Sequence, residues 1–371
     1  MFRHFAQYEF RGHSPLYERL SEFVADHAEL AAPLQAAPPK QRRAILYFAA
    51  VQYLLRTTAH GHPLSAYFPV FGGTRPADDA LAGVLTDLAT TYRAELADMC
   101  ATRTTQTNEA RRTALLRPGF GRVAATAGGG RLALVELGTS AGLLLAPDRY
   151  ACRYVRADGR DRTYGPNGAA ALLTMTCEVR GKGWPDPAGE PLAVAARVGV
   201  DLAPIEPTDP AGTDWLRSCI WPEHTDRLAR LDAALAEVAA VRPRLVAGDM
   251  VDTLPDVLAT VDEDTLPCVF ASNALTYLGR DGRRKLVEVL TELGRNRDLA
   301  LVLNEASSAG AELFVGRRPA EAGPRGVLAV GLLTVVTWQG GRGAVEVLAR
   351  TGPHGQWLEW DPAEYAYAPA L

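Results

Sequence analysis

The sequence has few cysteines, few lysines and little net charge, and each shortage excludes a class of protein. The five cysteines are scattered among 371 residues, at Cys100, Cys152, Cys177, Cys219 and Cys268. This spacing excludes a disulfide framework and a Cys-x-x-Cys metal or redox site, and it favours reduced thiols. Only three of the 39 basic residues are lysines, which we attribute to codon bias rather than to a binding strategy. The formal net charge of −4 provides no long-range attraction to nucleic acid or to anionic membranes.

No apolar run in the sequence is long enough to cross a membrane. The longest run near the C-terminus, residues 327–338, contains glycine and threonine and falls short of the roughly 20 residues that a spanning helix needs. No leader with a basic start and an apolar centre follows Met1. With 47% hydrophobic residues, the chain can bury one large core, or a core and a smaller domain. We therefore expect a globular, cytoplasmic protein.

Hydrophobic periodicity divides the chain into a helical first third and an α/β remainder. Apolar residues recur at three- and four-residue steps within residues 45–55 and 81–96, a pattern typical of amphipathic helices. The glycine-rich stretches RPGFGR and TAGGGR predict a loop-rich joint at residues 117–131. We therefore place an N-terminal helical domain at residues 1–125 and a second domain at residues 126–371.

After this joint, short apolar runs alternate with helical segments. The runs are LALVEL, RVGVDL, RLVAGD, PCVFASN, LALVLNE, VLAVGLLTVVTW and AVEVLAR. Such a β-α-β rhythm predicts a mostly parallel sheet with helices on both faces. Between the first two runs, residues 146–197 form a long irregular insertion, rich in Gly, Pro, Tyr and Arg, which we expect to be a lid or subdomain.

The stretch GTSAG at residues 138–142 fits two different kinds of site. G-x-S-x-G is the turn on which α/β-hydrolases carry a nucleophilic serine, which would be Ser140. With Glu136 before it, the same stretch is an acid-x-Gly-x-x-x-Gly loop that binds a nucleotide over a strand end. The loop follows the first strand, where doubly wound folds bind nucleotides, whereas a hydrolase turn comes after several strands. We therefore favour the nucleotide loop.

Two further acids end the next two expected strands. Asp201 ends the second strand, where a carboxylate can accept hydrogen bonds from both hydroxyls of a ribose. Asp249 ends the third, where it can accept a hydrogen bond from an adenine amine or cap a helix. For Asp249 alone the helix cap is the favoured interpretation. Three acids at three successive strand ends favour a nucleotide site.

These segments together resemble a known class of enzymes. The succession VELGTSAG, GVDLAP, VAGDM, CVFASNALTYL and LVLNEAS resembles the class I S-adenosylmethionine-dependent methyltransferases. The whole chain, including TNEARRTALLRPGF and RVGVDLAPIEPTDPAGTDWLRSCIWPEHTDRLARL, resembles the bacterial domain-of-unknown-function family 2332, which is methyltransferase-like. The resemblance implies a Rossmann-like, doubly wound sheet with an insertion after its first strand. It also implies S-adenosylmethionine as the cofactor, bound by Glu136, Gly138, Ser140, Gly142, Asp201 and Asp249.

The chain departs from the methyltransferase pattern at two of these positions. Ser140 stands where the loop usually has a central glycine, and its side chain would either crowd the methionine part of the cofactor or hydrogen-bond to it. Asp201 comes 201 − 136 = 65 residues after Glu136, a distance that the insertion explains.

Methyl transfer requires little acid–base catalysis, because the donor already carries an activated methyl group. Most of the catalysis comes from holding the donor and the acceptor in the right geometry. The ends of the fourth and fifth expected strands provide the catalytic candidates Asn273, Tyr277 and Glu305. Glu305 can serve as a general base if burial raises its pKa. An asparagine turn, a tyrosine packed on the sheet and a helix-starting glutamate explain these residues equally well.

Two polar clusters are candidates for binding the substrate, which we expect to be a small polar molecule. Asn108, Glu109 and Arg112 combine an amide, a carboxylate and a guanidinium, although the segment can also cap a helix. Trp221 and Arg227 lie around a proline that starts a helix. Metal-ligand spacing is absent throughout the sequence, and nothing in it indicates an oligomeric state.

Three functions remain open. The first is an S-adenosylmethionine-dependent transferase that moves a methyl or another alkyl group, including a cyclisation. The second is a serine hydrolase that uses Ser140, with His224 and His354 as the histidines that follow it. The third is a non-catalytic protein that senses a ligand or binds a partner.

Overall fold

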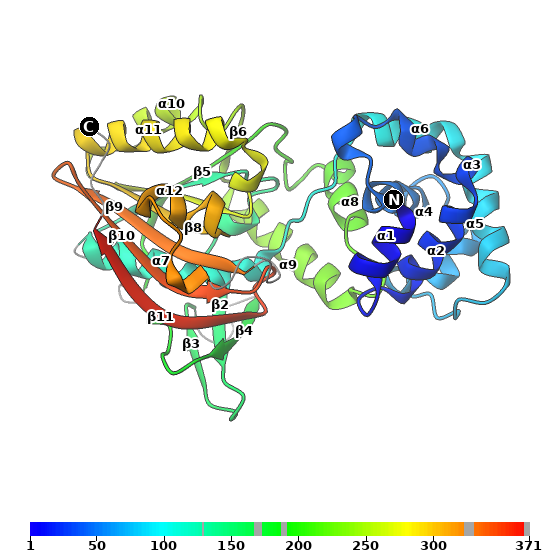
Figure 1. Cartoon of the computed structure of the whole chain (residues 1–371), viewed down its shortest axis with the longest axis horizontal. Coiled ribbons are helices and arrows are strands. Elements are labelled where there is room, and N and C mark those ends of the chain that lie inside the picture. The colour runs from blue at the N-terminus through cyan, green and yellow to red at the C-terminus, as the bar shows by residue number, and fades with distance from the viewer. Residues whose placement is uncertain (128–129, 167–172, 187–190, 323–329, 367–371) are drawn as a thin grey trace. The chain divides into compact units, whose positions relative to one another are not determined.

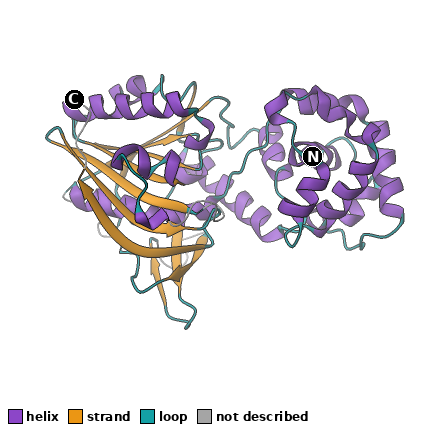
Figure 2. Ribbon diagram, in the orientation of Figure 1, coloured by secondary structure: helices purple, strands orange, loops and turns teal. Residues whose placement is uncertain are grey.

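The computed structural model describes residues 1–127, 130–166, 173–186, 191–322 and 330–366. The chain forms two compact units (Figure 1). The helical unit consists of Met1–Asn108 and Thr208–Asp232, and the sheet unit of Glu109–Pro207 and Ala233–Leu371. Figure 2 shows the strands gathered in the second unit and only helices and loops in the first. An α/β protein with an N-terminal helical region is therefore confirmed, whereas the division at residues 125 and 126 stays a prediction and falls at the end of a helix.

The helical unit is built from short helices. Its α-helices are α1 (Phe2–Phe5), α2 (Pro15–Asp26), α3 (Ala28–Ala31), α4 (Ala44–Arg56), α5 (Ala80–Thr91), α6 (Arg93–Thr102), α8 (Pro210–Ser218) and the first part of α9 (Thr225–Val241). Shorter 3-10 and π segments are η1 (Ala6–Phe10), η2 (Ala32–Ala36), η3 (Pro39–Gln41), η4 (Pro63–Tyr67) and η5 (Pro69–Phe71). The leucine pattern of residues 81–96 proves to be two helices, because the backbone of Tyr92 leaves the helical conformation, with a φ of −108° and a ψ of 31°.

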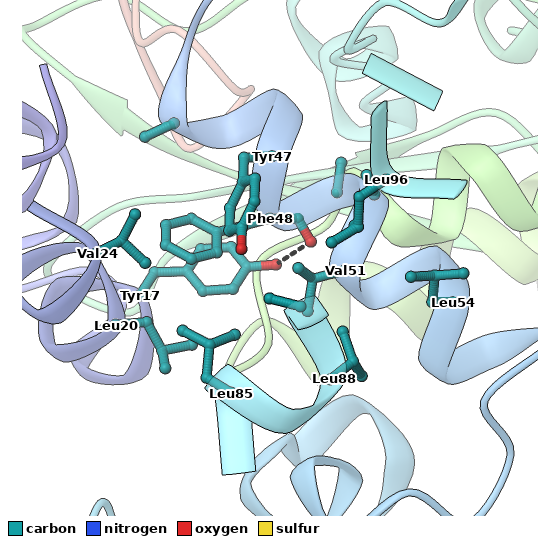
Figure 3. Packing of buried hydrophobic residues seen from close by; sticks show 14 of the residues in the cluster. Tyr17, Leu20, Val24, Tyr47, Phe48, Val51, Leu54, Leu85, Leu88 and Leu96 are labelled. Carbon is teal, nitrogen blue, oxygen red and sulfur yellow. Dashed lines mark hydrogen bonds between the residues drawn. The ribbon is translucent and has the colours of Figure 1, made fainter. Parts of the chain in front are cut away.

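Aromatic packing forms the centre of the helical unit. The rings of Tyr17 and Phe48 stack with their centroids 4.7 Å apart, and Tyr17 Oη donates a hydrogen bond of 3.4 Å to the Phe48 carbonyl (Figure 3). Gln52 on α4 donates from Nε2 to carbonyls at the end of α8, at 3.1 Å to Arg217 and 3.0 Å to Ser218. The last carbonyls of a helix need such donors, so this buried amide binds residues 208–232 to the N-terminal helices.

The sheet unit contains one sheet, with 11 strands among the described residues. The strands are β1 (Leu132–Leu137), β2 (Ala151–Val155), β3 (Asp161–Tyr164), β4 (Thr174–Arg180), β5 (Val194–Asp201), β6 (Arg244–Ala247), β7 (Leu266–Ser272), β8 (Leu299–Ala306), β9 (Gly331–Gln339), β10 (Arg342–Thr351) and β11 (Trp357–Ala366). Their order is β3-β2-β4-β11-β10-β9-β8-β7-β1-β5-β6. The five strands from β8 to β6 run parallel, β8 to β11 alternate in direction, and β4 pairs in parallel with both β11 and β2. The predicted mostly parallel sheet is confirmed.

Helices cover both faces of the central strands. The α-helices of this unit are α7 (Thr113–Thr126), the last part of α9, α10 (Leu254–Ala259), α11 (Arg280–Asn296) and α12 (Ala311–Val315). Ala133, Val135 and Leu137 of β1 pack in one apolar cluster with α10, α11 and α12, and Leu132 and Leu134 pack in another with α7. Alternate residues of β1 therefore face opposite cores, which explains why the whole strand is apolar except for Glu136.

The loop-rich joint predicted at residues 117–131 is wrong over most of its length, because α7 continues to Thr126. Pro118 lies inside this helix, where its missing N–H leaves the carbonyl of Ala114 without a helical donor. The hydroxyl of Tyr154 on β2 replaces that donor with a hydrogen bond of 2.7 Å to Ala114. A residue distant in sequence therefore provides the hydrogen bond that the proline removes from the helix.

Gly119 of the same helix is a packing residue. A Cβ added to it would lie 2.6 Å from Cγ1 of Val302 on β8. Glycine thus lets α7 approach the sheet closely, and the glycines that suggested a loop are explained by this contact.

The expected insertion, residues 146–197, is more regular than predicted in its described parts. It contributes β2, β3 and β4, which extend the main sheet through the parallel pair of β4 and β11. Its role as a lid stays a prediction.

Candidate functional site

The loop after β1 has an unusual backbone. Gly138, Ser140 and Gly142 all have positive φ angles, of 76°, 52° and 73°. A Cβ on Gly138 would lie 2.5 Å from Cβ of Ala274, which follows β7, so the loops after β1 and β7 touch and only glycine fits at this contact. Ser140 is a non-glycine residue in the left-handed region, a conformation that costs free energy and often marks a functional site.

Glu136 of β1 is buried beneath this loop. Its side chain is 3% exposed, and its Oε2 accepts a hydrogen bond of 2.7 Å from Oγ1 of Thr139. Gly199 of β5 is paired in register with Glu136, and a Cβ there would lie 2.4 Å from the same Thr139 Oγ1. The missing side chain of Gly199 therefore makes the space in which Thr139 reaches Glu136.

The surroundings of Glu136 favour its neutral form. Burial raises the pKa of this carboxyl to about 8, against the opposing effect of the Thr139 hydrogen bond. The negative charge of Asp201 raises the pKa further, and the positive charge of Arg112 lowers it. Buried acids with shifted pKa values concentrate at functional sites, although structural networks shift them too.

The predicted nucleotide-binding acids Asp201 and Asp249 lie at the expected strand ends, where each binds backbone N–H groups. Oδ2 of Asp201 accepts from the N–H of Ser140 at 2.8 Å, and Oδ1 accepts from the N–H of Ala203 at 3.0 Å. Oδ1 of Asp249 accepts from the N–H groups of Val251 at 2.8 Å and Asp252 at 3.2 Å. Asp201 thus holds the loop after β1, and Asp249 caps the turn after β6.

Glu305 lies near the end of β8 and supports the loop after β7. It is fully buried, and its Oε1 accepts hydrogen bonds from the N–H groups of Ala274 at 2.7 Å and Leu275 at 3.0 Å. Its Oε2 is buried with no hydrogen-bond partner among the described residues. Burial raises the pKa of Glu305 to about 7, while these two hydrogen bonds and the charge of Arg112 act in the opposite direction.

The two catalytic candidates in the loop after β7 differ in their surroundings. Asn273 has a φ of 54°, and its Nδ2 donates to the Pro353 carbonyl at 3.2 Å. Tyr277 is 79% exposed. Leu202, the residue after Asp201, is exposed to 76%. β1 lies between β5 and β7, so the loops that carry Leu202 and Tyr277 flank the loop after β1.

Arg112 connects this region to the turn before β11. Its side chain is 6% exposed and donates from Nη1 to the Ser272 carbonyl at 3.2 Å and from Nε to the Pro353 carbonyl at 3.3 Å. Its positive charge lowers the pKa values of both Glu136 and Glu305. Glu109, also buried, accepts from the N–H of Arg111 at 3.0 Å and so acts partly as a cap.

The other predicted substrate residues belong to the helical unit. Asn108, Trp221 and Arg227 lie within its two segments. Trp221 stacks on His224 with ring centroids 5.4 Å apart and meets Phe10 edge to face. Their part in binding a substrate at the strand ends stays a prediction.

Sequence reasoning missed the partners of the buried acids. Thr139 donates a hydrogen bond to Glu136, and Gly199 leaves the space for Thr139. In the sequence these two residues are only part of a glycine loop and of an apolar strand. In the sequence the turn at residues 352–355 offers only His354 as a candidate, whereas in the structure its carbonyls accept hydrogen bonds from Arg111, Arg112 and Asn273. A signal for this turn existed in its glycines and proline.

Comparison with protein families gives one match. A family described as "Uncharacterized protein conserved in bacteria (DUF2332)" matches residues 1–360. The chain belongs to this family. Both units of this DUF2332 protein lie almost wholly inside the match, so the helical unit is part of the family architecture. The curated proteins contain no match to the chain.

The resemblance to methyltransferases stays a prediction, because the match to DUF2332 carries no activity. In the described part of this DUF2332 protein, no group of three or more His, Cys, Asp or Glu side chains is arranged to hold a metal ion. None of the helices in the described ranges is long and apolar enough to cross a membrane.

Proposed function

We propose that this protein binds S-adenosylmethionine over the ends of β1, β5 and β6, and transfers a methyl or another alkyl group to a small polar acceptor beside β7 and β8. The strand order supports the proposal. The parallel strands β6-β5-β1-β7-β8 follow the order 3-2-1-4-5 of Rossmann-like doubly wound folds, whose ligands bind where the order reverses. That point lies between β1 and β7, where Gly138 touches Ala274.

The residues around this point are suited to such a cofactor. Both oxygens of Asp201 bind backbone N–H groups, but an ionised carboxylate has about four acceptor positions, so two remain for ribose hydroxyls. The second oxygen of Asp249 has no hydrogen-bond partner among the described residues and is left for an adenine amine. Exposed Leu202 adjoins Asp201 and offers apolar surface for a base.

When bound, the cofactor supplies an activated alkyl group on a sulfonium, so the protein needs mainly to orient the acceptor. Glu305 can hold or accept the proton that the acceptor loses, because a group with a pKa of about 7 exchanges protons readily near neutral pH. Its Oε1 is fixed by two N–H groups, which leaves Oε2 as the oxygen that receives the proton. Asn273 and Tyr277 belong to the loop that Glu305 supports, and we assign them to acceptor binding.

The observation that carries the proposal is the buried Glu136 under a glycine loop at the reversal of strand order. Calorimetric titration with S-adenosylmethionine and S-adenosylhomocysteine tests it. Asp201→Asn removes the charge and one acceptor oxygen, and we expect binding to weaken 10- to 100-fold, as is usual for a lost charge-assisted hydrogen bond. Asp281→Asn is the matched control, because its side chain is 90% exposed on α11.

Failure of both nucleotides to bind at millimolar concentration would exclude the cofactor. Equal binding by Asp201→Asn and the wild-type protein would exclude the assigned site. If binding is normal but no alkyl group leaves the cofactor with any acceptor tried, the protein is a sensor and the transferase proposal fails.

A further inference from the structure

A small cavity with both polar and apolar walls lies at the ends of β7 and β8, beside the hairpin of β9 and β10. It has a volume of about 30 Å³, and its walls include Asn273, Asn304, Gly331 and Thr351. This is roughly twice the volume that a single water requires. The cavity therefore has room for a polar group of two or three atoms.

A chain of hydrogen bonds runs through one wall of this cavity. Thr351 Oγ1 donates to Asn304 Oδ1 at 2.6 Å, and Asn304 Nδ2 donates to Ser272 Oγ at 3.0 Å. Thr351 and Asn304 are 0% and 1% exposed. Because an amide NH₂ carries two hydrogens, Asn304 has a second N–H beyond the one that binds Ser272.

The neighbouring Asn273 is also only partly engaged. Its Nδ2 donates to the Pro353 carbonyl at 3.2 Å, while its Oδ1 has no hydrogen-bond partner among the described residues. Asn304 and Asn273 both line the cavity, and each has one group, an N–H of Asn304 and the Oδ1 of Asn273, that no hydrogen bond between described residues uses. None of the described residues that form its walls is charged.

Gly331 keeps this space open. A Cβ at this position would lie 2.5 Å from Thr351 Oγ1 and 3.1 Å from Asn304 Oδ1. Any side chain would therefore push into the hydrogen-bonded wall. The glycine does not have a positive φ, so backbone conformation does not explain it.

We propose that this cavity binds a neutral group that both donates and accepts hydrogen bonds, such as a primary carboxamide or a hydroxyl at one end of a small molecule. A carboxylate would place an acceptor against Asn273 Oδ1, and an ammonium would be buried without a carboxylate partner, each at a cost in desolvation. A neutral amide satisfies both open positions. The cavity shares Asn273 with the acceptor site proposed above, but the binding proposed here does not require the cofactor.

Acetamide is a suitable probe, with acetate and ethylammonium as charged probes of similar size. Saturation-transfer NMR on the full chain, without any nucleotide, measures binding from the methyl signals. We expect a saturable acetamide signal and at least ten-fold weaker signals from both ions. Acetate binding as strongly as acetamide, or no saturable acetamide signal, overturns the proposal.

Variants assign the binding to this cavity. Thr351→Val removes the donor that orients Asn304, and Gly331→Ala fills the space, so each should weaken acetamide binding at least five-fold. Thr334→Val is the matched control, because Thr334 is a fully buried threonine of β9 that lies outside the cavity. Unchanged acetamide binding in both test variants, or an equal loss of binding in the control variant, overturns the assignment to this cavity. If a variant does not fold, the selectivity of the wild-type protein among the three probes still tests the proposal.

Discussion

The contact between Gly199 and Thr139 predicts a strong energetic coupling between β5 and the loop after β1. In Gly199→Ala, the new Cβ would lie 2.4 Å from Oγ1, 2.6 Å from Cγ2 and 2.7 Å from Cβ of Thr139. Thr139 must then leave its position and release Oε2 of Glu136. The buried carboxyl loses its hydrogen bond from Thr139.

The magnitude follows from these two effects. Overpacking in a dense core costs about 1–3 kcal/mol, and a lost hydrogen bond about 1 kcal/mol. Alanine regains roughly 0.5 kcal/mol, because glycine is unfavourable inside a strand. We therefore expect Gly199→Ala to lower the free energy of unfolding by about 2–3 kcal/mol. Thr139→Ala alone loses the hydrogen bond and should cost about 1–2 kcal/mol.

The double variant separates a specific contact from two independent losses. Thr139→Ala removes two of the three close contacts, and the hydrogen bond is lost only once. The double variant should therefore be about 1–2 kcal/mol more stable than the sum of the single effects predicts. Urea unfolding of the four proteins, followed by tryptophan fluorescence, measures this difference. Additivity within about 0.5 kcal/mol would refute the reasoning.

Three further predictions concern the same site. Ser140→Gly should retain nucleotide binding, because glycine adopts the left-handed backbone freely. Fluorophosphonate probes, which react with activated serines, should not label the wild-type protein. Stoichiometric labelling that Ser140→Ala abolishes would establish the serine hydrolase instead. Gly138→Val should lower the melting temperature by several degrees even without ligand, because its side chain clashes with Ala274; an unchanged melting temperature would contradict this contact. Folding raises the pKa of Glu305 from 4.5 to about 7, so its contribution to stability is present below pH 4.5 and is lost as the pH rises to about 7. Glu305→Gln should thus gain roughly 3 kcal/mol relative to the wild-type protein between pH 4.5 and pH 8, as measured by urea unfolding, and a constant difference would contradict the shifted pKa.

The order of apolar and polar residues along the chain was enough to predict the central strands. The strands that carry Glu136, Asp201 and Glu305 were found because parallel central strands are apolar on both faces and their ends are marked by polar residues. The α7 helix was missed because Pro118 and Gly119 usually end helices, and the contacts that make them acceptable come from β2 and β8.

The sequence predicted where the acids of the candidate site lie along the strands. It did not predict which groups they bind by hydrogen bonds. That Asp201 lies at a strand end follows from sequence, whereas its hydrogen bond to the loop after β1 depends on the pairing of two strands separated by the insertion. The role of Gly199 depends on register in the same way. Sequence pattern locates strand ends, but it does not show which side chains meet across them.

The hydroxyl of Tyr154 limits how this protein can be shortened by engineering. It bonds the Ala114 carbonyl that Pro118 leaves open, and Arg117 of the same helix donates to the Pro147 carbonyl, so α7 depends on the segment between β1 and β5 at two points. This segment is therefore no removable appendage. A version trimmed to a minimal parallel sheet would leave α7 with an unbonded carbonyl and a buried guanidinium, unless the proline and the arginine were replaced in the same step.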